Sequence, residues 1–487
     1  MIKDAQIAEV PSERIKRFIS RCVNWRRLTT PIAIILSLFI GFTLFAFPSK
    51  LALAAAALVT GLMLTLVIIR NPFVGMFAYI LCEYGRPQDQ FPALASLHIS
   101  KFVLIILAIA WVLRLISERK SDIVWNAQSW AFSGFLFVMG LTVVTAVNNH
   151  WAFQYFRGMF ITFLGYFLFI SLIDSMPRFQ KFFWLFLLTH AFLAVKGIHR
   201  YATGYQTAGF AAGSFIGDEN DFAMVLNNVI PYAYFSFFGA KSSIQRVGSL
   251  LLFFLFIIAV VLSFSRGGFV GLIPVLGYCL LRSPRRGLAT AMAVGSILSM
   301  ILVAPTGYWD EVRSIKDAHN EEDTGKVRIE SWKAAIRMFI DYPIIGVGAG
   351  NFPIRFEEYQ SSWFGDLSMW GRATHGTYPQ VLAELGLAGT FFFIWMIYLN
   401  FRDIWQIKNM TKVQRDLPYY MAEGITVSMI GYLISAIFLS TLYYPHLWML
   451  SAITVSLRNA VMKDAANTTQ DVRNLTYVEG KAVTSSV

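Results

Sequence analysis

The chain has 487 residues, of which 56% are hydrophobic and only 14% are charged. A soluble domain carries roughly 25% charged residues, so this composition excludes an ordinary soluble enzyme and indicates a membrane protein. The net charge of +12 does not call for a nucleic-acid partner, because the basic residues fall in short segments between apolar runs, as the positive-inside rule requires. The three cysteines show no metal-ligand spacing, so we expect neither a disulfide framework nor a zinc site.

The apolar runs predict 12 to 14 membrane-spanning helices. The basic N-terminal segment places the N-terminus in the cytoplasm, and it is too long and polar for a cleaved signal peptide, so the first run is expected to be a retained helix. The runs 72–84 and 445–458 are short for a span, which leaves the number open. In chain order the runs lie at about 31–47, 51–69, 72–84, 101–117, 129–147, 156–174, 181–198, 221–239, 247–264, 267–282, 287–304, 376–400, 420–441 and 445–458.

This threading divides the chain into five parts. They are a cytoplasmic N-terminal segment 1–30, transmembrane helices with short loops 31–304, a periplasmic loop 305–375, C-terminal transmembrane helices 376–458 and a cytoplasmic tail 459–487. Within the periplasmic loop, the helical spacing of apolar residues predicts an amphipathic helix over 327–340. A glycine-dependent turn is expected just after it, at Gly346, Gly348 and Gly350.

Several arginines lie at the outer ends of predicted helices, against the topology rule. They include Arg86, Arg157 and Arg200, and any one could be a side chain that snorkels to the interface; for Arg86 and Arg200 this explanation is as good as a functional one. Arg266 is harder to explain in that way, because it lies between two closely spaced apolar runs in the glycine-flanked stretch SFSRGG. A guanidinium group binds phosphate through two parallel hydrogen bonds. We therefore expect an anionic partner for Arg266 at the membrane surface, such as a lipid-linked phosphate or diphosphate.

His375 also lies at this outer boundary and could accept a proton near neutral pH. The alternative is a loop histidine hydrogen-bonded to the backbone. Glu384 is nine residues further on and so lies roughly opposite on a helix. We expect it to be a buried structural acid that pairs with another helix. Asp218 and its neighbouring acids could form a metal or sugar site, but capping of the following helix is the preferred interpretation.

Three motifs in order resemble the O-antigen ligase and O-antigen polymerase superfamily. They are SFSRGG at 263–268, RIESWKAAIRMFIDYPIIGVGAGNF at 328–352 and HGTYPQVLAELGLAG at 375–389. The stretches NPFVGMFAYILCEYGRPQDQ at 71–90 and GSFIGDENDFAMVL at 213–226 are more similar to the branch of exosortase-associated O-glycosylation ligases. The chain differs from the usual pattern at two places. At Gly376 the family commonly has Asn or Ser, and near Gln206-Thr207 the family has an arginine that this chain lacks.

The resemblance implies an all-α polytopic membrane protein with a GT-C-type helical bundle and a large periplasmic loop. Such an enzyme of the bacterial inner membrane moves a glycan from an undecaprenyl-diphosphate carrier to an acceptor hydroxyl, with inversion and without a metal or cofactor. By the motif match, Arg266 would bind the diphosphate and His375 would act as the general base. Further candidates for substrate binding are Arg157, Arg200, Arg86 and Arg328.

Several functions stay open within and beyond this class. The acceptor could be the lipid A core, a growing polysaccharide chain or a protein hydroxyl, which would make the protein a ligase, a polymerase or an O-oligosaccharyltransferase. The rival of another class is a transporter or flippase of an anionic lipid-linked glycan, and a non-catalytic scaffold is a third possibility. The lack of a clear internal repeat and the one-sided loop 305–375 favour an enzyme over a transporter.

Overall fold

The computed structural model describes residues 50–85, 99–118, 123–204, 218–305, 307–309, 313, 325–364 and 368–484. Every regular element among them is a helix, and seven of these helices are long and apolar enough to cross a membrane. The predicted all-α polytopic fold is therefore confirmed, while the number of 12 to 14 spans stays a prediction. The run 31–47, Arg86 and the Gln206-Thr207 region lie outside the described residues.

The chain forms two compact units, and the smaller one consists of residues 1–82 and 93–123. Its described helices are α3 (Lys50–Arg70), the first part of α4 (Pro72–Gly85) and α6 (Ile99–Glu118). They pack closely because Gly75 on α4 carries no side chain; a Cβ there would lie 2.6 Å from Ile68 and 2.9 Å from Leu107. The outward faces stay apolar, as a lipid environment requires, with Leu58 65% exposed.

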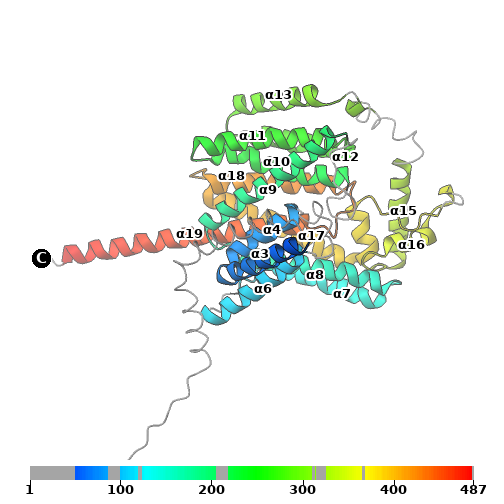
Figure 1. The fold of residues 1–487 in the computed structure, drawn as a ribbon, viewed down its shortest axis with the longest axis horizontal. Coiled ribbons are helices and arrows are strands. Elements are labelled where there is room, and N and C mark those ends of the chain that lie inside the picture. Colours follow the sequence, from blue (N-terminus) through cyan, green and yellow to red (C-terminus); the bar gives the residue numbers. More distant parts are fainter. Residues whose placement is uncertain are drawn as a thin grey trace, which may run out of the picture. The chain divides into compact units, whose positions relative to one another are not determined.

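The larger unit contains the remaining helices, and most of them run side by side in one bundle (Figure 1). At its centre α10 (Glu219–Gly239) packs against α18 (Leu417–Ser435). Both helices are apolar on nearly all sides and buried accordingly. Around them lie α7 (Ala127–Thr145), α8 (Asn149–Leu172), α9 (Met176–Ala202), α11 (Ser243–Val261), α12 (Arg266–Arg282), α13 (Arg286–Val303), α17 (Thr377–Thr411) and α19 (Pro445–Thr484).

The segment expected to be the periplasmic loop forms a small helical layer at one end of the bundle. Helix α15 (Gly325–Asp341) runs crosswise to the bundle helices, with α16 (Phe352–Tyr359) beside it (Figure 1). A helix is thus present where an amphipathic one was predicted over 327–340. Its buried face contributes Ala334 and Met338 to a cluster that also holds Phe352 of α16 and Ala383 of α17. The larger apolar side chains that made the pattern, Ile329, Ile336 and Ile340, are exposed instead. This cluster attaches the layer to the first turns of α17.

Helix α17 is interrupted at Gly386, whose φ of 58° and ψ of −158° are not helical. The segment 343–348 fills the interruption. The amides of Val347 and Gly348 donate to the carbonyls of Ala383 and Glu384, at 2.8 and 3.0 Å, before the break. Beyond it, the amides of residues 387 and 388 donate to the carbonyls of residues 343 and 344, at 2.8 and 3.0 Å. The loop thus replaces the hydrogen bonds that the break removes from the helix.

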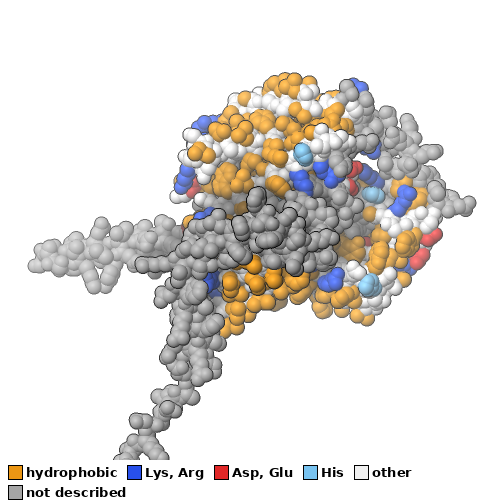
Figure 2. All heavy atoms as spheres, viewed as in Figure 1, with side chains coloured by type: hydrophobic (Ala, Val, Ile, Leu, Met, Phe, Trp, Pro, Cys, Tyr) orange, Lys and Arg blue, Asp and Glu red, His pale blue; other side chains and the backbone are white. Residues whose placement is uncertain are grey.

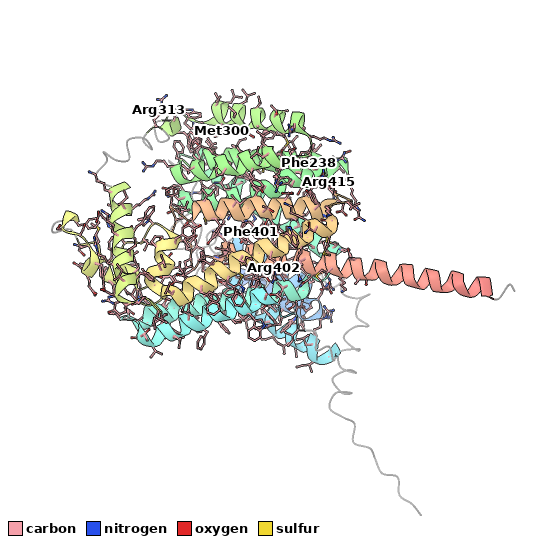
Figure 3. All side chains as sticks on the ribbon, turned by 180° about the vertical axis from the view of Figure 1, so that it is seen from behind. Phe238, Met300, Arg313, Phe401, Arg402 and Arg415 are labelled. Carbon is pink, nitrogen blue, oxygen red and sulfur yellow. The ribbon has the colours of Figure 1, made fainter. Side chains whose placement is uncertain are left out.

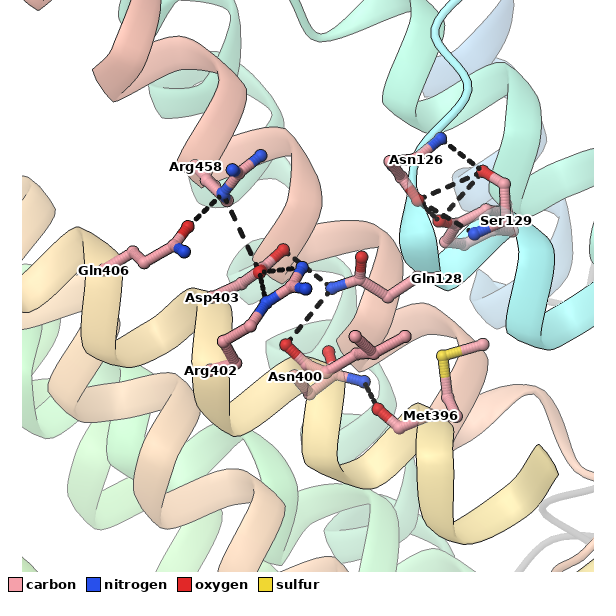
Figure 4. A network of polar contacts seen from close by, with 11 residues as sticks. Asn126, Gln128, Ser129, Met396, Asn400, Arg402, Asp403, Gln406 and Arg458 are labelled. Carbon is pink, nitrogen blue, oxygen red and sulfur yellow. Dashed lines mark hydrogen bonds and ion pairs between the residues drawn. The ribbon is translucent and has the colours of Figure 1, made fainter. Parts of the chain in front are cut away.

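Two buried carboxylates mark the other end of the bundle. Asp403 on α17 is 1% exposed and accepts hydrogen bonds from Arg402 at 2.7 Å and from Gln128 on α7 at 2.8 Å (Figure 4). Glu423 on α18 is paired with Lys408 at 2.8 Å. Figure 3 shows Arg415 at this end and Arg313 at the opposite end. Buried charges need such partners, so these pairs hold α7, α17 and α18 in register.

Gly386 in α17 and Gly346 in the segment that fills the interruption generate a stability prediction, because each packs against the backbone of the other's segment. A Cβ at Gly386 would lie 2.5 Å from the carbonyl carbon of Ile344, and one at Gly346 would lie 2.4 Å from that of Glu384. Both residues also have positive φ. We expect Gly386→Ala and Gly346→Ala each to lower the free energy of unfolding by at least about 1–3 kcal/mol. The measurement is thermal unfolding in detergent, followed by loss of the monodisperse peak.

The matched control is Gly277→Ala in α12, where a Cβ would meet nothing within 4 Å. Alanine in an open helical position should leave the midpoint unchanged or raise it. Equal midpoints for all three variants would contradict the role of the glycine pair.

Candidate active site

The SFSRGG stretch forms the sharp turn between α11 and α12 and makes Arg266 the first residue of α12. Phe264 has a φ of 59°. Ser265 caps α12, since its hydroxyl oxygen accepts from the amide of Gly268 at 2.9 Å. The same hydroxyl donates to Asn220 in the first turn of α10 at 2.6 Å. Arg266 is therefore held beside the N-terminus of α10.

The glycines after Arg266 serve helix packing. A Cβ on Gly268 would lie 2.4 Å from the Cβ of Ala223 on α10. The carbonyl of Gly268 also accepts from the side-chain amide of Asn227 at 2.9 Å. Helix α10 thus packs directly against the backbone of α12 at Gly268. Gly267 is more open, because a Cβ there would come no closer than 3.7 Å to a neighbouring atom.

His375 lies in a short segment, which we call the His375 strap (residues 374–376), just before α17 and has a φ of 50°. Hydrogen bonds fix the backbone on both sides of His375. The carbonyl of Thr374 accepts from the hydroxyl of Ser331 on α15 at 2.8 Å, and the amide of Thr377 donates to the carbonyl of Ala436 at 2.8 Å. Between them, Gly376 leaves no room for a side chain, because a Cβ would lie 2.9 Å from the indole nitrogen of Trp332. Packing therefore accounts for the glycine at 376.

Arg266, Arg328 and His375 lie close enough for their charges to interact. Burial lowers the pKa of Arg328, and the positive charge of Arg266 lowers it further. Burial likewise lowers the pKa of His375, with an additional contribution from Arg328. His375 is therefore a neutral imidazole at neutral pH, available to accept a proton. Figure 2 shows basic, acidic and histidine side chains together in a hollow beside the α15 layer.

Asp218, for which capping of the following helix was the preferred interpretation, also acts on His375. It does cap α10, since its carboxylate accepts from the amides of Asn220 and Asp221 at 2.9 and 2.8 Å. Its negative charge also acts on His375 and raises the pKa of that side chain, which partly offsets the arginines. No spacing in the sequence signals this proximity, because α10 and the His375 strap meet only in the folded bundle.

Glu384 is 1% exposed and holds the segment that follows α15. Its carboxylate accepts from the amide of Gly350 at 2.9 Å and from that of Phe352 at 3.3 Å. It also accepts from the hydroxyl of Tyr443, between α18 and α19, at 2.6 Å. The expected helix partner is thus replaced by backbone amides and a loop tyrosine. No described hydrogen bond joins Glu384 to His375, and Glu384 connects three segments around the site.

Arg157 and Arg200, the other described candidates for substrate binding, have fewer described contacts with the site. Arg200 is near the end of α9, and the ring of its neighbour Tyr201 packs at 5.8 Å against Phe264 of the SFSRGG turn. Arg157 is exposed on α8, and no described interaction brings it to His375. Among the residues that the structure describes, no group of three or more His, Cys, Asp or Glu side chains could hold a metal ion.

The charge around His375 generates a prediction that needs no activity assay. Replacing Arg328 with glutamine removes a repelling charge, so the pKa of His375 should rise toward its ordinary value of about 6.5. Carbethoxylation by diethyl pyrocarbonate requires the neutral ring, so its rate at His375, followed by mass spectrometry across pH, reports this pKa. The inflection should lie below about 6.5 in the wild type and at higher pH in Arg328→Gln.

The control for this titration is Lys326→Gln, an exposed cation on the same helix. It should leave the inflection where it is in the wild type. An unchanged inflection in Arg328→Gln would show that the two side chains do not interact.

The comparison with protein families agrees with these motifs. Residues 251–394 match the family model described as O-antigen ligase, and no curated protein matches the chain. The matched range contains Arg266, Arg328, His375 and Glu384, whereas Arg157 and Arg200 precede it. The part of the chain that carries the clustered arginines and the histidine is therefore similar to the O-antigen ligase family.

Proposed function

We propose that the protein transfers a glycan from an undecaprenyl-diphosphate carrier to an acceptor hydroxyl at the periplasmic face of the bacterial inner membrane. The observation that carries this proposal is the mutual repulsion of Arg266 and Arg328 beside a neutral histidine. An anion bound between the two guanidinium groups would relieve that repulsion, and phosphate oxygens match their geometry. The O-antigen ligase match over 251–394 supports the same class of donor.

In the proposed reaction, His375 takes the proton of the acceptor hydroxyl as its oxygen attacks the anomeric carbon. The bond from that carbon to the diphosphate oxygen breaks, and its electron pair leaves with undecaprenyl diphosphate. Arg266 and Arg328 stabilise the negative charge that develops on the leaving group. Attack in line with the departing diphosphate inverts the anomeric centre. The proton leaves His375 when the site exchanges its products for new substrates.

The acceptor separates three versions of this function. Lipid A core sugars, the end of a growing polysaccharide or a protein hydroxyl would each fit the same chemistry. A flippase of a lipid-linked glycan would also use the arginines, but it would have no use for a general base. Counterflow of labelled substrate without bond cleavage would favour that rival.

The test is transfer from a defined undecaprenyl-diphosphate glycan to candidate acceptors, with mass analysis of the product. We expect His375→Ala to lower the rate by roughly 10²–10⁴-fold, because it removes the base. Arg266→Gln should lower it by about 10²–10³-fold, because it removes a stabilising charge from the leaving group.

The matched control is Arg286→Gln, an exposed arginine at the start of α13 and beyond the far end of α12. It should transfer glycan at the wild-type rate. Folded His375→Ala and Arg266→Gln variants that transfer glycan at the wild-type rate would overturn the mechanism.

A further inference from the structure

A pocket of about 450 Å³ opens between α8 and the turn that joins α18 to α19. On α8 it is lined by Trp151, Gln154, Tyr155 and Gly158, whose spacing places them on one face of the helix. Its volume lies in the range of small-ligand sites. Gly158 keeps the α8 side of the pocket free of a side chain at that position, and a Cβ there would meet nothing within 4 Å.

The opposite wall consists of Tyr443 and Tyr444, and both rings are held in place. The hydroxyl of Tyr443 donates to the buried carboxylate of Glu384 at 2.6 Å. That of Tyr444 donates to Asp221 on α10 at 3.2 Å. The ring of Tyr155 packs against that of Tyr443 with a centroid distance of 4.8 Å. The aromatic faces are thus ordered before any ligand arrives, which lowers the entropic cost of binding.

The pocket adjoins the proposed reaction centre. Asp221, which binds Tyr444, is three residues from Asp218, whose charge acts on His375. Burial raises the pKa of Tyr444, and both acids raise it further, so all three groups lie close together. A ligand in the pocket would therefore lie next to the site of transfer.

The chemistry of the lining selects the ligand. Among the described residues that line the pocket there is no Lys, Arg, Asp or Glu, so this lining does not fit the diphosphate. Three tyrosine rings and one indole, with the amide of Gln154, fit a pyranose ring, which presents C–H groups on its faces and hydroxyls at its edge. A polyprenyl tail is a poorer fit, because the described lining residues include just one aliphatic side chain, a methionine.

We infer that this pocket is a glycan subsite, which stacks a neutral sugar ring of the donor or of the acceptor while transfer occurs at His375. The inference rests on the proposed function and adds where the rest of the glycan is held. Tyr155 is the central contact, because it packs against Tyr443 and faces the pocket from α8.

The experiment compares Tyr155→Ala with Tyr155→Phe, which keeps the ring, and with Phe153→Ala, an exposed residue on another face of α8. Donors with one sugar and with four sugars on undecaprenyl diphosphate are tested, and separately acceptors of the same two lengths. In Tyr155→Ala the KM for the longer substrate should rise about 3- to 10-fold with kcat unchanged. The shorter substrate, Tyr155→Phe and Phe153→Ala should match the wild type.

If the KM in Tyr155→Ala depends on the length of the donor, the stacked sugar belongs to the donor. If it depends on the length of the acceptor, the stacked sugar belongs to the acceptor. Equal KM values for both lengths in Tyr155→Ala and the wild type would overturn the inference. Saturation-transfer difference NMR with free tetrasaccharides of glucose, galactose, mannose and N-acetylglucosamine reads binding without transfer. Signals on sugar C–H protons in the wild type that vanish in Tyr155→Ala would support the subsite. If such signals were seen without any transfer, the subsite would stand and only the proposed function would be wrong. Signals that persist in Tyr155→Ala, or that no tetrasaccharide gives, would overturn it.

Discussion

The candidate site depends on the interruption of α17 at Gly386 and on the segment that fills it. A continuous helix would satisfy its own backbone, and the segment 343–348 would then have no place to dock. Because the helix is broken, four of its backbone groups bind that segment instead. Glu384 adds its carboxylate to the amides of Gly350 and Phe352. The α15 layer, which carries Arg328, is thereby fixed to the helix that follows His375.

A second constraint is the neutralisation of buried charge. Asp403 and Glu423 are surrounded by cations at one end of the bundle, whereas the end that holds His375 has Arg266 and Arg328 acting on one another. The first arrangement stabilises the packing of helices without any ligand. In the second, like charges are held together by the fold, which favours binding of an anion.

The helices were predictable because an apolar run has few alternatives in a membrane. Each run that falls among the described residues lies in a helix, and most of the bounds differ by only a few residues. The largest difference is α19, expected to end at 458 and found to continue to Thr484. Helix α17, expected to end at 400, continues to Thr411, because Arg402 and Asp403 neutralise one another and allow the helix to extend. The break at Gly386 could not be predicted, since it requires a partner segment some forty residues earlier. For the same reason the sequence showed Arg266 and His375 as candidates but gave no sign that Asp218 or Tyr444 lies near them.

The interrupted helix also sets the order in which this region can assemble. Residues 343–348 are synthesised before residues 383–388, so the loop exists before the interruption that it fills. Until the two meet, backbone groups around Gly386 lack partners in a medium that offers no water. Docking of the loop and completion of α17 are therefore a single cooperative step, and a chain that has formed one has also positioned the other.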